Sequence, residues 1–293
     1  MIAVAAGLLT ALCWAGTTLT SARASRAMGA GSALAIVMLT GFVIVAPVIV
    51  LTPVPEAVRA PGTIALLAVA GIGNVLGLLF LYHAYSTGLV AIVSAIASTE
   101  GSIAAVVALL LGERLAPPLV GALAIVAVGI TAVAAVRNRA DDDSTPDAPA
   151  PPSRMAGAAF ALASGAAISF GISLYAVGRA AIELPLPWAV LPARLAGVVA
   201  VTFPLLVLGR LHLNRAGLPW AIASGVLEVA GIITFGIGAR DAIAVTAVLT
   251  CLFVPLTAVL AVPMFRERLA RPQVAAIGVV ALGVGLVGAL RAT

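Results

Sequence analysis

The chain has 293 residues, of which 62% are hydrophobic and only 9% are charged, and its mean hydropathy is +1.21. A soluble globule of this size needs far more polar side chains to cover its surface, so the composition excludes a water-soluble protein. The net charge of +5 comes from arginine without lysine. The arginines are spread over the loops, which is typical of membrane-interface anchors and does not favour a nucleic-acid partner.

Long apolar runs follow one another along the whole chain. A helix that crosses a bilayer needs about 20 apolar residues, and each run has roughly that length. We interpret the first run as a helix and not as a cleaved secretory signal, because no basic residue precedes it. The runs predict an all-α integral membrane protein with ten transmembrane helices, at residues 2–21, 33–51, 63–82, 89–111, 117–136, 155–177, 186–208, 217–238, 242–264 and 272–290.

One stretch breaks this pattern. Residues 141–153 contain four aspartates and four prolines, and such a segment cannot bury itself. We therefore expect residues 137–154 to be a polar linker between a first five-helix repeat, 1–136, and a second five-helix repeat, 155–293.

The two units share a sequence. Residues 112–133 and 266–287 align without a gap at an offset of 154, and 11 of the 22 positions are identical. The shared positions include the scarce pair Glu113-Arg114, which returns as Glu267-Arg268. Because five crossings is an odd number, the second unit must enter the membrane from the opposite face. The sequence therefore predicts two inverted five-helix repeats, an arrangement typical of transporters.

Three charged residues fall inside predicted helices, namely Glu100, Arg194 and Glu228. A charge at the centre of a spanning helix costs about 2.5–3.5 kcal/mol on insertion scales, so each should face a cavity or a partner. Glu228 lies near the middle of its helix, and the offset of 154 pairs it with Asn74. We expect these two to meet at mid-membrane and bind a solute. A helix-bridging hydrogen bond is the alternative reading.

Arg194 is the natural counter-ion for either carboxylate, Glu100 or Glu228. Protonating the paired acid would release the arginine, which is a plausible device for proton coupling. A purely structural salt bridge is the equally weighted alternative.

The charged residues of the loops are given simpler roles. We expect Glu113 and Arg114 to neutralise one another and to anchor the start of the next helix, and the same of Glu267 and Arg268. A gating role for these loop residues is the alternative. Arg240 and the adjacent Asp241 should pair at the surface.

The sequence carries no signature of an enzyme. Metal-ligand spacing on one helix face, a phosphate-binding glycine loop and a nucleophile elbow are all missing, and the chain has two histidines. Cys13 and Cys251 lie within apolar helices and are expected to be reduced and inert. We predict no cofactor and no metal. The rival class is a non-transporting membrane protein, such as an intramembrane lipid-modifying enzyme or an assembly factor.

The two Glu-Arg-Leu-x-x-Pro copies, Trp14 with Gly16, and Arg194 in the seventh predicted helix are similar to the EamA-type drug/metabolite transporter family. The resemblance implies a central cavity formed by helices one to four and six to nine. It also implies export or exchange of amino acids, related metabolites or xenobiotics. Thr40 stands where the family often has arginine, so the first half departs from the pattern.

Together these observations predict a multi-pass secondary transporter of the cytoplasmic membrane that works by alternating access, with proton-coupled export left open. Its partners are a small-molecule solute and the lipid bilayer, and a monomer and a homodimer remain equally open. A small amphipathic solute would suit the predicted binding residues, which are Trp14, Asn74, Tyr82, Tyr85, Glu228 and Phe235. The predicted coupling or counter-ion residues are Glu100, Arg194 and Glu228.

Overall fold

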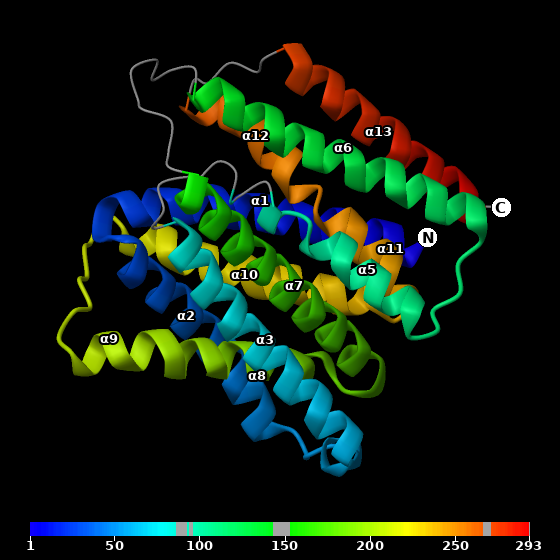
Figure 1. Ribbon diagram of the computed structural model, residues 1–293. Helices are drawn as coiled ribbons and strands as arrows, with labels where there is room; N and C mark the ends of the chain where they lie inside the picture. Colours follow the sequence, from blue (N-terminus) through cyan, green and yellow to red (C-terminus); the bar gives the residue numbers. More distant parts are fainter. Residues whose placement is uncertain (86–92, 94–95, 143–152, 266–270, 293) are drawn as a thin grey trace.

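The computed structural model describes residues 1–85, 93, 96–142, 153–265 and 271–292 (Figure 1). Its elements are helices throughout, with no strand among these residues. In order they are α1 (Ile2–Met28), α2 (Ala30–Leu51), a short 3-10 turn (Glu56–Arg59), α3 (Pro61–Tyr85), α5 (Glu100–Leu110), α6 (Pro117–Asp142), α7 (Ser153–Glu183), α8 (Leu186–Gly197), a π-helical turn (Val198–Thr202), α9 (Phe203–Val207), α10 (Leu218–Ala239), α11 (Ile243–Thr250), α12 (Phe253–Phe265) and α13 (Arg271–Ala292).

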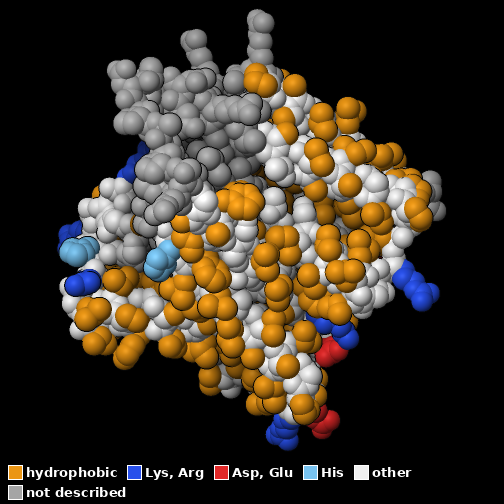
Figure 2. Space-filling model, in the orientation of Figure 1, with side chains coloured by type: hydrophobic (Ala, Val, Ile, Leu, Met, Phe, Trp, Pro, Cys, Tyr) orange, Lys and Arg blue, Asp and Glu red, His pale blue; other side chains and the backbone are white. Residues whose placement is uncertain are grey.

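The predicted all-α class is confirmed, and within the described residues seven helices are long and apolar enough to cross a membrane. Helices fit this role because they satisfy their own backbone hydrogen bonds, which lipid cannot do. The outer surface carries hydrophobic side chains over most of the face seen in Figure 2, with charged side chains at its extremities. Such an apolar perimeter matches a molecule whose solvent is lipid. The count of ten spans stays a prediction.

Several predicted helix ends are wrong. The first helix continues to Met28, and only Gly29 separates it from α2. Gly29 has φ of +84°, a backbone conformation that L side chains rarely adopt, so a glycine can turn the chain within one residue. At the predicted linker, α6 continues through Asp142 and α7 begins at Ser153. The division of the chain into two repeats at residues 137–154 stays a prediction.

Two predicted spans are interrupted in the middle. The span predicted at 89–111 has a turn at Ser98–Thr99, after which α5 begins at Glu100. The span predicted at 242–264 has a turn at Cys251–Leu252, between α11 and α12. These two interruptions lie at nearly equivalent positions when the offset of 154 is applied.

The packing of the helices also repeats between the halves. The helix α1 packs along α10, and α3 packs along α7. Likewise α12 packs on α1 as α5 packs on α7, and α10 packs on α2 as α3 packs on α8. Two further pairs join equivalent helices, α2 with α8 and α6 with α13, the last seen side by side at the top of Figure 1. These pairings are therefore preserved when the halves are exchanged.

Candidate functional site

A cavity of about 750 Å³ lies within the helix bundle. Its volume is in the range of small-molecule binding sites. Helices from both halves of the chain line it, and most of the lining is apolar. The charged or amide side chains of the lining are Asn74, Glu100, Arg194 and Glu228.

The ion pair of the cavity joins α8 to α10. The guanidinium Nη2 of Arg194 donates to Oε1 of Glu228 at 3.3 Å. The Arg194 side chain is 1% exposed and that of Glu228 is 21% exposed, so the carboxylate faces the cavity while the arginine is enclosed behind it. The sequence left two carboxylates open as partners of Arg194, and the structure pairs it with Glu228.

A glycine makes room for this arginine. A Cβ added to Gly41 of α2 would lie 2.7 Å from Cδ of Arg194 and 3.1 Å from Cγ2 of Val229. The aliphatic part of Arg194 therefore lies directly against the α2 backbone, and the small residue sets how closely the two helices approach.

We expect Gly41→Ala to lower the free energy of unfolding by about 1–3 kcal/mol, because the enclosed Arg194 side chain cannot move away from the added methyl. The measurement is thermal or denaturant unfolding in detergent. Gly62→Ala is the matched control, since a Cβ there meets no atom within 4 Å. Equal stability of the two variants would contradict the close packing of Arg194.

Glu100 lines the same cavity from a different position than the sequence indicated. It was expected in the middle of a continuous helix, but it is the first residue of α5, directly after the turn at Ser98–Thr99. A carboxylate is favourable there because the first turn of a helix carries partial positive charge. The interruption of the second half lies beside the same cavity, since Phe253 at the start of α12 is also part of its lining.

Three lining side chains keep hydrogen-bond donors without a partner in the described part of the chain. These atoms are Nε1 of Trp14, Nδ2 of Asn74, and Nε and Nη1 of Arg194. Buried donors normally find an acceptor, and their absence from any hydrogen bond is unusual for packed helices. These donors belong to side chains that line the cavity.

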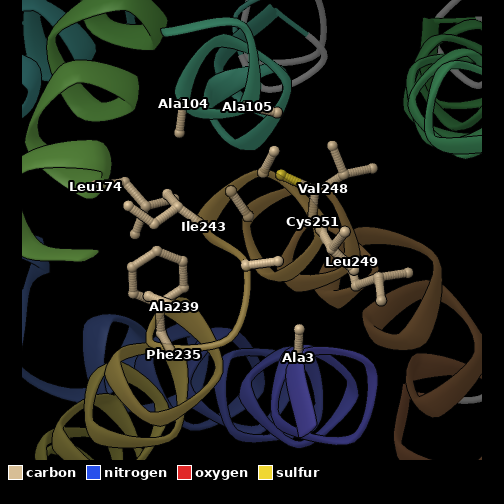
Figure 3. Close-up of a cluster of buried hydrophobic side chains, with 14 of the residues drawn as sticks. Ala3, Ala104, Ala105, Leu174, Phe235, Ala239, Ile243, Val248, Leu249 and Cys251 are labelled. Carbon is tan, nitrogen blue, oxygen red and sulfur yellow. The ribbon is translucent and has the colours of Figure 1, made fainter. Parts of the chain in front are cut away.

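Among the described residues, the predicted binding residue Phe235 does not join this group. Phe235 is fully buried in the apolar core near Leu174, Ala239 and Ile243 (Figure 3) and does not line the cavity, so its predicted contact with solute is not supported. It shares a face of α10 with Glu228 but lies two turns further along the helix. Tyr82 and Tyr85 belong to the last turn of α3, and their side chains lie outside the described residues.

Residues that the sequence reading missed form a hydroxyl-bearing stripe on α1. Thr17, Ser21 and Ser25 recur at every fourth position and line the cavity together with Thr18. The hydroxyl of Ser21 is hydrogen-bonded to that of Ser224 on α10 at 2.6 Å. The four-residue spacing was the signal available in the sequence, because it puts these hydroxyls on one helix face.

The predicted surface pair of Arg240 and Asp241 is wrong. Arg240 does not pair with Asp241 but donates to the carbonyl oxygens of Ala181 and Leu184 at the end of α7, at 2.6 and 2.9 Å. Asp241 pairs with Arg291 of α13 at 3.2 Å. Glu113 accepts the backbone N–H of Ala244 at the start of α11. The second copy, Glu267-Arg268, lies outside the described residues.

Comparison with known proteins agrees with this geometry. Residues 1–135 match the EamA-like transporter family, so the predicted resemblance is confirmed there. A solved chain described as "Crystal structure of protein" has the same fold, with a TM-score of 0.77 and 16% sequence identity over 98% of this chain and 96% of that chain. No curated protein matches the chain. The match of residues 1–135 and the helices that are apolar and long enough to span a bilayer support a multi-pass membrane protein.

Proposed function

We propose, from the match of residues 1–135 to the EamA-like transporter family, that the chain is a secondary transporter that moves a small solute across the cytoplasmic membrane by alternating access. The observation that carries this proposal is the cavity. It is lined by both halves of the chain and contains an arginine and two carboxylates in a bundle that otherwise presents apolar side chains to lipid. Ionisable groups inside a membrane protein mark substrate or ion pathways.

Two further features support alternating access by inverted repeats. The pairings of α1 with α10, of α1 with α12 and of α2 with α10 each have a counterpart when the first and second halves are exchanged. The spans that contain α5 and α11 are each interrupted near the cavity, and paired interruptions of this kind mark binding sites in transporters with inverted repeats. Exchanging the conformations of the two halves would turn the cavity from one face of the membrane to the other.

The lining indicates the chemistry of the solute. Apolar side chains such as Leu78, Phe170 and Ile232 form most of the wall, while Glu228 and Arg194 provide charge of both signs. A small amphipathic metabolite, amino acid or drug-like molecule suits this combination. Trp14, which packs edge-to-face on Phe253 with ring centroids 6.1 Å apart, adds an aromatic contact.

Proton coupling follows from the ion pair. Protonation of Glu228 would remove the charge that compensates Arg194, and a buried arginine without a partner is costly. The arginine would then take a solute acceptor in place of the carboxylate. Proton binding and solute binding thereby become linked through one pair of side chains.

Two leucine-to-tryptophan variants on α2 test the transport function. Leu34 lines the cavity, whereas Leu39 is 37% exposed on the outer surface. In vesicles containing the purified protein, we expect wild type and Leu39→Trp to carry radiolabelled solute from a panel of amino acids and amphipathic drugs. We expect Leu34→Trp to reduce that flux at least about tenfold, because an indole would occupy the cavity.

Folding of both variants is checked by size-exclusion elution and by thermal unfolding. Flux that is equal in both tryptophan variants would remove the cavity from the transport path. Wild-type vesicles that carry no solute of the panel, with or without a pH gradient, would instead favour a non-transporting membrane protein.

A further inference from the structure

One end of the bundle is closed by apolar packing. This closed end contains the N-terminal turns of α1, the C-terminal turns of α10 and the start of α11. Figure 3 shows its side chains, with Ala3, Phe235, Ile243 and Leu249 filling the space between helices of the two halves. For a solute to leave the cavity in this direction, these helices must separate.

A carboxylate from the first half holds the start of α11. Glu113 lies in the loop after α5, and both of its carboxylate oxygens accept the backbone N–H of Ala244, at 3.2 and 3.1 Å. The first amides of a helix have no acceptor within the helix, so an outside acceptor stabilises them. Here that acceptor comes from 131 residues away in the chain.

A carboxylate from the second half does the same for α1. Asp241 lies in the loop before α11, next to its N-cap residue Ala242, and its Oδ2 accepts the backbone N–H of Ala3 at 3.0 Å. The same oxygen lies 3.2 Å from Nη2 of Arg291. Each half of the chain therefore supplies one acid that binds the N-terminal amides of a helix from the other half.

We propose that Glu113 and Asp241 form a reciprocal latch that keeps this end of the cavity closed, and that both contacts break when the cavity opens there. The latch rests on the proposed transport function. It gives the glutamate of the duplicated Glu-Arg motif a role beyond neutralising the adjacent arginine. The contacts suit a gate because they join the halves at their rim, where separation begins.

The surroundings of Glu113 indicate whether its hydrogen-bond acceptor or its negative charge holds the Ala244 amide. Burial raises the pKa of its carboxyl, against the opposing effects of the Ala244 and Ile243 amides and of Arg291, while Asp241 raises it further. A raised pKa means that the closed state binds a proton at Glu113 more readily than a solvated carboxyl group does. A neutral acceptor should therefore keep the end closed, whereas loss of the acceptor should not.

The test uses the thiol of Cys251, which is 1% exposed at the turn after α11 and belongs to the same apolar cluster as Phe235 and Ile243. A Cys13→Ala background leaves it as the single cysteine of the chain. The purified protein in phosphatidylcholine–phosphatidylglycerol vesicles is exposed to a membrane-impermeant maleimide, and the labelling rate is measured. We expect Glu113→Ala to label about tenfold faster than Glu113→Gln, because glutamine retains an acceptor oxygen for Ala244.

Equal labelling rates for Glu113→Ala and Glu113→Gln would overturn the latch. If elution and thermal unfolding show that Glu113→Ala does not fold, the labelling rates of Asp241→Ala and Asp241→Asn are compared instead. Equal rates for these two variants would then overturn the latch. Labelling requires no transported solute, and flux is measured on the same vesicles. A failure of the transport proposal is thereby separated from a failure of the latch.

Discussion

Glu228→Gln is expected to lower the free energy of unfolding by about 3 kcal/mol and to abolish any flux driven by a pH gradient. Removing one member of a buried ion pair leaves the other charge without compensation, which typically costs about 3–5 kcal/mol. Arg194 is 1% exposed, so water cannot replace its lost partner. The cavity-facing Glu228 is 21% exposed, which places the expected loss of stability at the lower end of that range. Denaturant unfolding in detergent measures the first effect and vesicle flux the second.

Two controls separate charge from volume. Glu183→Gln breaks the pair between Arg179 and Glu183, whose side chains are 39% and 37% exposed, and should cost less than about 1 kcal/mol. The double variant Arg194→Met with Glu228→Leu should recover most of the stability but not the response to pH, since it removes both charges together. A single Glu228→Gln variant as stable as wild type would show that Arg194 does not depend on this carboxylate.

Gly101→Ala is expected to be the most damaging change of a single methyl group, with a loss of about 1–3 kcal/mol or failure to fold. A Cβ on Gly101 would overlap the backbone carbonyl oxygen of Ala247 and Sγ of Cys251. The backbone of α11 cannot rotate away as a long side chain could, so α5 and α11 would have to separate. This crossing joins the two interrupted spans beside the cavity, and solute flux should fall with the stability.

Gly121→Ala in α6 is the matched control, because a Cβ there meets no atom within 4 Å. Alanine is the better helix former by roughly 0.5–1 kcal/mol, so this variant should be as stable as wild type or more so. Thermal unfolding of both variants in one detergent is the measurement. Similar midpoints for Gly101→Ala and Gly121→Ala would contradict the close approach of α5 to α11.

The charged residues of the site could be recognised from the sequence because a charge is costly within the lipid bilayer. Glu100, Arg194 and Glu228 all lie within apolar runs, where a charge needs a cavity or a partner. All three line one cavity in the structure, together with Asn74 and Trp14. Their roles in binding and coupling remain proposals until flux is measured.

Phe235 shows where this reasoning stops. A helical wheel places it on the face of Glu228, but a wheel reports direction and not depth along the axis. Two turns separate the residues, and within that distance α10 passes from the cavity into the closed apolar core. The interruptions at Ser98–Thr99 and Cys251–Leu252 were equally hidden, because neither turn contains the glycine or proline that usually marks one.

Composition and residue spacing were enough to establish an all-helical membrane protein and the identity of its intramembrane charges. Both follow from local physics, since every residue within lipid faces the same cost for unsatisfied polar groups. The partner of Arg194, the interruption of two spans and the inter-half contacts of Glu113 and Asp241 were decided by the packed structure alone. These features depend on how separate helices are rotated and shifted against one another in the packed bundle, and no local pattern encodes that.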